Sequence, residues 1–263
     1  MEDGLRPGLR MEVADHIDAL RAEGERMAAA VAGSSPDAAV PTCPEWVVRD
    51  LVRHMGGVHR WATGYVAGAR TEVWDVDLDE VVGTWPGDSE LAGWLRAGCE
   101  ALAAALAAAP ADLECWTFLR APSPLAMWSR RQAHETAIHR VDAELAAGAI
   151  PGPLPAHFAA DGVGELLECF VPRRSTTLRA EEPASLAVGC TDADAAWLLG
   201  IGAEGVTTHP AASMPAGADC SVRGPAAGLY LALWNRTGPE ALAIEGDRAV
   251  LGLFLDQVHV RWS

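Results

Sequence analysis

The sequence predicts an α+β protein, with a four-helix bundle over residues 1–150 and a smaller α/β domain over residues 151–263. Two contrasts along the chain support this division. The first half contains four stretches in which apolar residues recur at helical spacing, whereas the second half contains short apolar runs typical of strands. Between the halves, the run PGPLP at 151–155 interrupts the helical pattern and indicates a boundary.

The predicted helices of the first half are placed by their start and stop signals. One is expected to begin at the stretch TCPE, 42–45, which fits a capping box with proline in the first turn, and to continue to about Val66. Another begins at Ser123 and Pro124, an N-cap residue followed by proline at the first helical position, and ends near Gly148. The remaining two are expected over 13–31 and 88–106.

The second half is expected to alternate helices with short strands. The helices are predicted at 156–170 and 225–236, and the strands at 185–190, 196–201, 219–224 and 241–246. The runs between them are rich in glycine and proline, which favour turns.

Charge and composition exclude several classes of function. The formal net charge of -16 disfavours a nucleic-acid partner, because phosphate binding requires clustered lysine and arginine. A membrane span is not expected, since no uncharged apolar stretch of about 18 residues occurs. The N-terminal region lacks a signal-peptide pattern, and the six cysteines are scattered without tight pairing. A cytoplasmic protein with free thiols is therefore expected.

The stretch RRQAHETAIHRVDAE, 130–144, carries a carboxylate and an imidazole on one helical face. Residues four apart are separated by about 40° around a helix axis, and residues five apart by about 140°. Glu135 and His139 are therefore neighbours, whereas His134 and His139 cannot bind one ion from a straight helix. Asp142 is expected either to orient a metal ligand or to form a surface ion pair, and the ion pair is favoured.

His54 lies in the middle of the apolar stripe of the second helix, whereas His59 is expected to face outward. A buried imidazole must be hydrogen-bonded or bound to a metal. Together with Glu135 and His139, His54 would supply two imidazoles and one carboxylate from facing helices, a common way to build a metal centre in a bundle. Three protein ligands leave a coordination position open, as in catalytic zinc sites. The alternative is that His54 is a hydrogen-bonded histidine of the core and that Glu135 forms an ordinary i,i+4 pair with Arg131 or His139.

Two stretches resemble the signature helices of the mycothiol-dependent maleylpyruvate isomerase family, which belongs to the DinB-like metalloenzymes of actinobacteria. These stretches are TCPEWVVRDLVRHMGGVHRWA, 42–62, and MWSRRQAHETAIHRVDAELA, 127–146. The later stretch CSVRGPAAGLYLALWNR, 220–236, resembles the family's C-terminal domain, which is similar to sterol-carrier folds. The resemblance implies a DinB-like metal-binding four-helix bundle followed by a sterol-carrier-like domain.

The resemblance also implies a site and a chemistry. Zinc or another divalent ion would be held by His54, Glu135 and His139, with mycothiol as the thiol cosubstrate and a small electrophile as the substrate. The family uses an arginine of the C-terminal domain near the metal. Arg236 is the best match and Arg223 the second, although this chain has asparagine where the family usually has glycine before the arginine.

Three functions are compatible with these observations. The first is a metal-dependent isomerase or thiol S-transferase that acts as a monomer or homodimer. The second is a hydrolase that uses metal-bound water and needs a general base, for which Asp142 is the candidate. The third is a non-catalytic binding protein for a small molecule or lipid. Trp46, Trp61 and Trp128 are expected either to line the pocket or to pack in the core, the commoner role.

Overall fold

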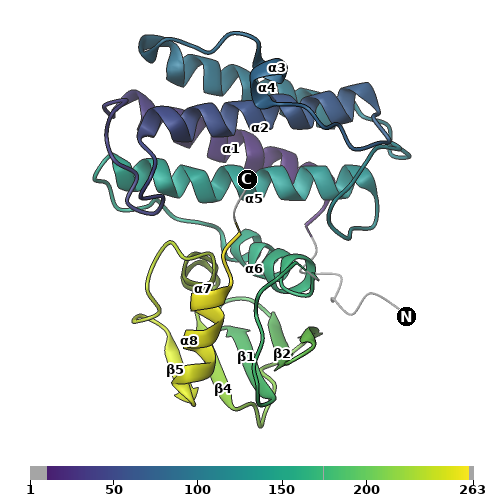
Figure 1. Cartoon of the computed structure of the whole chain (residues 1–263), viewed down its shortest axis with the longest axis vertical. Helices are drawn as coiled ribbons and strands as arrows, with labels where there is room; N and C mark the ends of the chain where they lie inside the picture. The colour runs from purple at the N-terminus through teal and green to yellow at the C-terminus, as the bar shows by residue number, and fades with distance from the viewer. Residues whose placement is uncertain (1–10, 174, 261–263) are drawn as a thin grey trace. The chain divides into compact units, whose positions relative to one another are not determined.

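The computed structural model describes residues 11–173 and 175–260 (Figure 1). The chain divides into two compact units, and the division falls between Gly152 and Pro153. The first unit is helical, and the second combines helices with a sheet. This mixed helical and sheet architecture confirms the predicted fold class.

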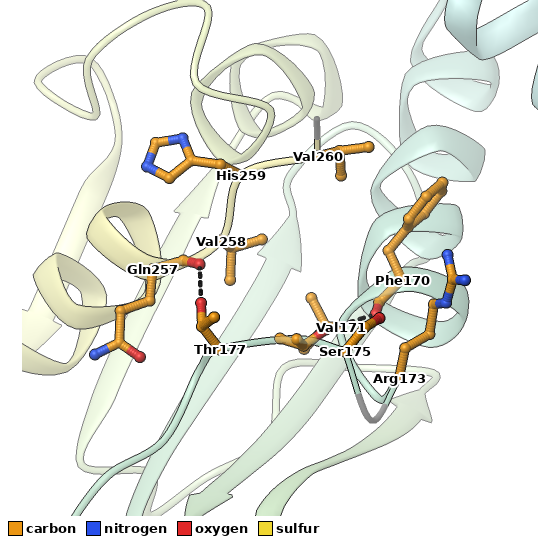
Figure 2. A pocket seen from close by; sticks show the side chains of 10 residues that line it. Phe170, Val171, Arg173, Ser175, Thr177, Gln257, Val258, His259 and Val260 are labelled. Carbon is orange, nitrogen blue, oxygen red and sulfur yellow. Dashed lines mark hydrogen bonds between the residues drawn. The ribbon is translucent and has the colours of Figure 1, made fainter. Parts of the chain in front are cut away.

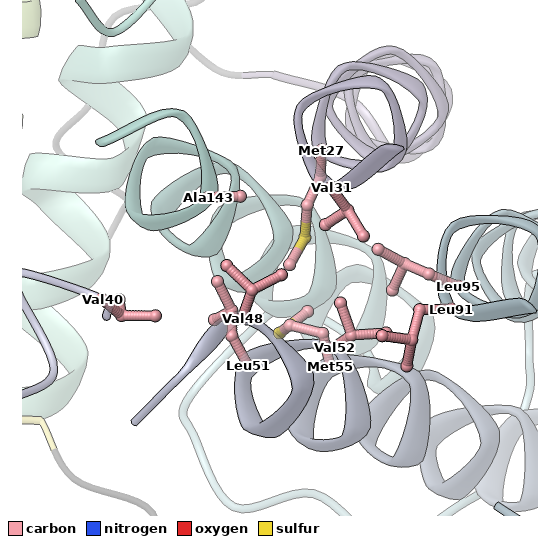
Figure 3. Close-up of a cluster of buried hydrophobic side chains, with 10 residues drawn as sticks. All are labelled: Met27, Val31, Val40, Val48, Leu51, Val52, Met55, Leu91, Leu95 and Ala143. Atoms are coloured by element: carbon pink, nitrogen blue, oxygen red, sulfur yellow. The ribbon is translucent and has the colours of Figure 1, made fainter. Parts of the chain in front are cut away.

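The first unit is a bundle of four long helices, α1 (Val13–Ala32), α2 (Val48–Gly68), α4 (Leu91–Ala108) and α5 (Pro124–Ala146). A short helix, α3 (Leu78–Val82), and a 3-10 turn at Asp88–Glu90 lie in the connection between α2 and α4. Helix α1 packs against α4 and α5, and α2 packs against the same two helices. Figure 3 shows one apolar cluster of this core, which includes Met27, Leu51, Met55 and Leu95.

The expected start of the second long helix is wrong. Helix α2 begins at Val48, and the N–H group of Val47 donates to the Asp50 carboxylate at 3.1 Å. Thr42 is not the N-cap, because it lies ahead of the helix, and its hydroxyl donates to Asp142 at 2.6 Å. The TCPE stretch therefore forms a turn ahead of the helix. A contact with α5 holds this turn, and a contact so distant in sequence cannot be predicted from local sequence signals. The predicted N-cap of α5 is confirmed, since Ser123 accepts a hydrogen bond from the Ala126 N–H.

One segment, Asp88–Ala108, is long and apolar enough to cross a membrane by length and composition alone. Its apolarity has a simpler explanation in the bundle. Residues on one side of α4 are buried in contact with α1 and α2, among them Leu91, Leu95, Leu102 and Leu106. The opposite side is mostly alanine and charged residues, so the segment has the pattern of an amphipathic bundle helix.

A buried ring of ion pairs joins α1 to the end of α5. The Arg140 guanidinium is fully buried, and it donates to Glu23 and to Glu144, each at 2.6 Å. Arg26 closes the ring, with nitrogen atoms 3.0 Å from Glu23 and 3.6 Å from Glu144. Glu144 also accepts the Gly152 N–H at 2.8 Å, so the ring fixes the chain where it leaves the bundle.

We expect Arg140→Met to lower the free energy of unfolding by about 3 kcal/mol, because it leaves the carboxylates of Glu23 and Glu144 with the partly exposed Arg26 as their remaining cation in the ring. Urea unfolding measures this loss. The matched control is Arg96→Met, which breaks the exposed pair between Arg96 and Glu25 on α4 and α1. That variant should unfold almost like the wild type, since exposed ion pairs contribute little. Equal losses in the two variants would contradict the role assigned to the buried ring.

The second unit is built on a sheet with the strand order β3-β2-β1-β4-β5. Strands β1 and β4 run parallel, and the other neighbouring pairs are antiparallel. The strands are β1 (Ala184–Cys190), β2 (Ala196–Gly202), β3 (Gly205–Ala211), β4 (Cys220–Gly224) and β5 (Ala243–Gly246). The helices are α6 (Ala156–Gly164), continued by a π-helical stretch at Glu165–Phe170, α7 (Ala226–Leu233) and α8 (Arg248–Gln257).

Four of these strands and two helices lie where the sequence predicts them, and two elements were missed. Strand β3 pairs only with β2 at the edge of the sheet and is largely exposed, so its sequence GVTTHPA lacks an apolar run. Helix α8 begins after Asp247, whose side chain accepts the Ala249 N–H. Its ten residues contain a glycine and follow a strand directly, which obscures the helical period.

A hollow of about 290 Å³ opens on the second unit beside the end of the π-helical stretch (Figure 2). It is lined by the chain after Phe170 and by residues following α8, with Arg173 and His259 at its rim. A hydrogen bond from the Thr177 hydroxyl to the Gln257 carbonyl, 2.9 Å long, joins the two segments. None of the predicted site residues lines this hollow.

Candidate metal centre

Helices α2 and α5 bring His54, Glu135 and His139 together, as their helical spacing and the family resemblance predict. The Nε2 atoms of His54 and His139 lie 3.5 Å and 3.3 Å from Oε1 of Glu135. The three side chains are 13%, 5% and 8% exposed, so the cluster is shielded while His54 keeps some access to solvent. One ligand atom from each residue lies within 4.8 Å of the other two.

On α5, each of His139 and Glu135 has one polar atom facing the cluster and a second polar atom bound to a charged neighbour. Nδ1 of His139 donates to Asp142 at 2.8 Å, which leaves Nε2 as the nitrogen that faces the cluster. Oε2 of Glu135 accepts from Arg131 at 2.7 Å, which leaves Oε1 as the inward oxygen. Asp142 is fully buried, so the favoured expectation of a surface ion pair is wrong and the alternative, orientation of a ligand, describes its contacts.

The electrostatics of the cluster favour an ionised carboxylate. Burial alone would raise the pKa of Glu135, but Arg131 and the two imidazoles more than offset it and hold the pKa well below its usual value. Burial lowers the pKa of His54. For His139, burial acts in the same direction, but the hydrogen bonds to Asp142 and Glu135 outweigh it and raise the pKa.

The donor set fits a divalent ion such as zinc. A tetrahedral zinc ion with bonds of about 2.0–2.1 Å holds its ligand atoms about 3.4 Å apart. The separations of 3.5 Å and 3.3 Å between the imidazole nitrogens and the carboxylate oxygen match this spacing. Imidazole nitrogen and carboxylate oxygen are also the usual ligands of catalytic zinc, and the hydrogen-bonded neighbours of His139 and Glu135 complete the pattern.

Trp46 covers the imidazoles. Its ring centroid lies 4.9 Å from that of His54 and 6.0 Å from that of His139, nearly parallel to the latter. Trp61 and Trp128 instead belong to an aromatic cluster with Tyr65, in which ring centroids are 5.0–5.3 Å apart. Trp46 therefore lines the site, as one of the two expectations had it, whereas Trp61 and Trp128 pack against other aromatic rings.

Three other histidines of the bundle, His16, His59 and His134, lie outside the cluster. His134 is buried, and its ring contacts that of His16 on α1, with centroids 6.1 Å apart. The expectation that His59 faces outward is wrong. His59 is fully buried and its Nε2 lies 2.9 Å from the Thr136 hydroxyl of α5, because the bundle packs α5 over a wider arc of α2 than its apolar stripe indicates.

The two candidate arginines belong to the second unit. Arg223 is exposed on β4, whereas Arg236 is partly buried after α7 and donates to the Trp234 carbonyl at 2.8 Å. The preceding residue, Asn235, has a φ of 60°, in the left-handed region that favours glycine and tolerates asparagine. The asparagine thus keeps the backbone conformation that glycine would adopt. The assignment of Arg236 to the metal centre stays a prediction.

Comparison with known proteins identifies the family. The model of the mycothiol maleylpyruvate isomerase N-terminal domain matches residues 17–144, and that of the corresponding C-terminal domain matches residues 157–253. The chain belongs to the mycothiol-dependent maleylpyruvate isomerase family. The prediction of an enzyme of this family is thereby confirmed at the level of the family.

Solved structures of the mycothiol-dependent maleylpyruvate isomerase share the fold. Two of them, the enzyme and a histidine-to-alanine variant of it, align with a TM-score of 0.60 at 15% and 14% identity. Each alignment covers 89% of this chain and 93% of the other. No curated protein matches the sequence significantly. Membership of the maleylpyruvate isomerase family therefore rests on the domain models, and the structural likeness concerns the fold.

The buried state of His59 leads to a pH prediction. Burial lowers its pKa from 6.5 to about 3. The unfolded chain therefore takes up the proton first as the pH falls, so stability present above pH 6.5 is lost progressively toward pH 3. Glutamine at this position does not titrate. Between pH 7.5 and 5.5, His59→Gln should lose about 1.4 kcal/mol less unfolding free energy than the wild type.

Urea unfolding at the two pH values measures this difference, and His209→Gln, at an exposed histidine, is the control. The control should follow the wild type. An identical pH dependence of the wild type and His59→Gln would show that His59 is accessible to protons in the folded protein.

Proposed function

We propose that this protein is a divalent-metal-dependent enzyme that activates mycothiol, or a similar small thiol, for addition to an electrophilic small molecule. The observation that carries the proposal is the convergence of His54 Nε2, His139 Nε2 and Glu135 Oε1 at separations suited to one ion. Family membership supplies the thiol, because the family is named for a mycothiol-dependent enzyme. The product is either an isomer of the substrate or a thiol conjugate.

The bound ion would act as a Lewis acid, lowering the pKa of a thiol that takes the open coordination position. The protein residues prepare that position. Arg131 keeps Glu135 ionised and uses one of its oxygens, so that the other faces the ion. Asp142 fixes the His139 tautomer whose Nε2 can coordinate. Trp46 lies over both imidazoles and excludes water from that side of the cluster.

In the proposed reaction, the sulfur of the deprotonated thiol forms a bond to an electrophilic carbon of an activated double bond. For isomerisation, the former double bond rotates as a single bond, and the carbon–sulfur bond then breaks to return the thiol. For transfer, the carbon next to the new bond takes up a proton, and the conjugate leaves. Arg236 is the residue proposed to stabilise the negative charge that develops on the electrophile.

The structure gives the hydrolase alternative less support than the sequence did. Its candidate general base, Asp142, is fully buried and accepts hydrogen bonds from His139 and Thr42, so it has no oxygen directed at a substrate water. Turnover of amide or ester substrates without any thiol would nevertheless favour a hydrolase. The lipid-binding alternative would be favoured by a lipid retained through purification of a protein without activity.

We expect about one equivalent of zinc per wild-type chain by plasma mass spectrometry, and a loss of most of it in His54→Ala, Glu135→Gln and His139→Ala. The two histidine variants remove a ligand and Glu135→Gln removes the charge of the third, and metal sites tolerate such losses poorly. His59→Gln is the matched control, at a buried histidine on the same helix as His54 whose Nε2 meets the Thr136 hydroxyl instead. Zinc retained by all three ligand variants, or lost equally from the control, would contradict the assignment.

We expect metal-loaded protein to convert an activated unsaturated acid only when mycothiol is present, either to an isomer or to a thiol conjugate, and Arg236→Met to lower kcat/KM about 100-fold, as for loss of a group that stabilises developing charge. Arg223→Met, on the exposed face of β4, is the control and should keep wild-type activity. If Arg223→Met lost activity and Arg236→Met kept it, the charge-stabilising role would belong to Arg223 instead of Arg236. Detection of neither mycothiol-dependent isomerisation nor thiol consumption with any of a panel of electrophiles would refute the proposed function.

A further inference from the structure

The segment between α1 and α2 contacts the metal centre at two points four residues apart. The Thr42 hydroxyl donates to Oδ1 of Asp142 at 2.6 Å. Trp46 places its indole over His54 and His139. We call this segment the Thr42–Trp46 loop. The Trp46 side chain also packs against the apolar core of the bundle, whereas the function proposed above does not explain the Thr42 contact.

The loop is tied into a compact unit by its own backbone. The Trp46 N–H donates to the Cys43 carbonyl at 2.8 Å, and the Cys43 N–H donates to the Val40 carbonyl at 3.0 Å. The Val40 N–H in turn donates to the Trp46 carbonyl at 3.0 Å. Because these bonds close successive turns, Thr42 and Trp46 cannot move far independently of each other.

Asp142 connects this loop to a metal ligand. Its two oxygens are divided between the elements, with Oδ1 accepting from Thr42 and Oδ2 accepting from Nδ1 of His139 at 2.8 Å. The Cys43 sulfur lies 3.9 Å from Oδ2 and packs against the same carboxylate. Since Asp142 is fully buried, water cannot replace the threonine hydroxyl cheaply. The orientation of the carboxylate, and through it that of His139, depends on the loop.

We propose that Thr42 is a positioning residue of the metal centre, which couples binding of the ion to closure of the Thr42–Trp46 loop over it. The inference rests on the proposed function in that the His54, Glu135 and His139 cluster must bind a divalent ion. Coupling of this kind is reciprocal: if the closed loop strengthens His139 as a ligand, the bound ion must hold the loop closed by the same factor.

Cobalt affinity, measured by chelator competition, tests the first half of this reciprocity. Thr42→Val keeps the shape of the side chain and removes the hydroxyl, and it should weaken cobalt binding about 10-fold, the usual effect of losing a neighbour that orients a ligand. Thr42→Ser restores a hydroxyl and should restore the affinity. Thr63→Val is the control, because the Thr63 hydroxyl donates to the His59 carbonyl within α2 and should not influence binding.

Two further measurements separate coupling from a general loss of packing. In the wild type, zinc should slow hydrogen exchange of the amides at Cys43 and Trp46, and this protection should be largely lost in Thr42→Val. In Asp142→Asn, which already weakens the link to His139, adding Thr42→Val should cost little further affinity, because both substitutions break the same chain of contacts. A full additional 10-fold loss in the double variant would overturn the route through Asp142.

The outcomes distinguish this inference from the proposed function. Wild-type protein that binds no cobalt or zinc would refute both. If the wild type binds the ion, and Thr42→Val binds it equally well with the same protection of the loop, the coupling is refuted while the metal centre stands. Weaker binding by Thr42→Val that Thr42→Ser does not restore would also refute it, since the hydroxyl would then not be the cause.

Discussion

A buried carboxylate whose charge must be compensated is the constraint on which the candidate metal centre depends. Glu135 lies inside the bundle with 5% of its side chain exposed, where an unpaired negative charge would be too costly to keep. Arg131, which is fully buried one turn earlier on the same helix, provides a fixed positive charge at 2.7 Å. The carboxylate can therefore stay ionised between two imidazoles, as a ligand of a divalent ion requires.

The same constraint explains the composition of α5. This helix is buried on almost every side, and its buried residues include many that are charged or polar. Several of these groups find a partner on a neighbouring element: Asp142 meets the Thr42 hydroxyl, Arg140 meets Glu23, and Thr136 meets His59. Networks of this kind fix one arrangement of the helices, because any shift of α5 along its neighbours would break several buried contacts together.

Family membership narrows the chemistry without selecting a substrate. The contacts of Arg131 and Asp142 would suit the cluster to the proposed ion and thiol, but neither residue selects among electrophiles, and one fold can host several reactions. In the second unit, the left-handed backbone at Asn235 preserves a turn before Arg236 despite the change from the usual family residue. Selection of the electrophile thus depends on groups other than the metal ligands.

The sequence by itself determined the fold class, most helices and strands, and the three residues of the cluster. It could do so because these features follow from periodicity. Glu135 and His139 are four residues apart and therefore share one helical face, and the position of His54 in an apolar stripe directs its side chain into the bundle. The missed strand β3 shows the limit, since an exposed edge strand carries little periodic signal.

Only the tertiary structure decided which partners the remaining polar groups have. Thr42 and Asp142 are 100 positions apart, and His59 and Thr136 are 77 apart, so no local pattern links them. Thr42 has the sequence context of a helix cap, and Asp142 that of a surface ion pair, yet packing of α5 buries the carboxylate and brings the hydroxyl to it. A buried group takes whichever partner the fold supplies, and that choice is set by the packing of helices rather than by neighbours in the chain.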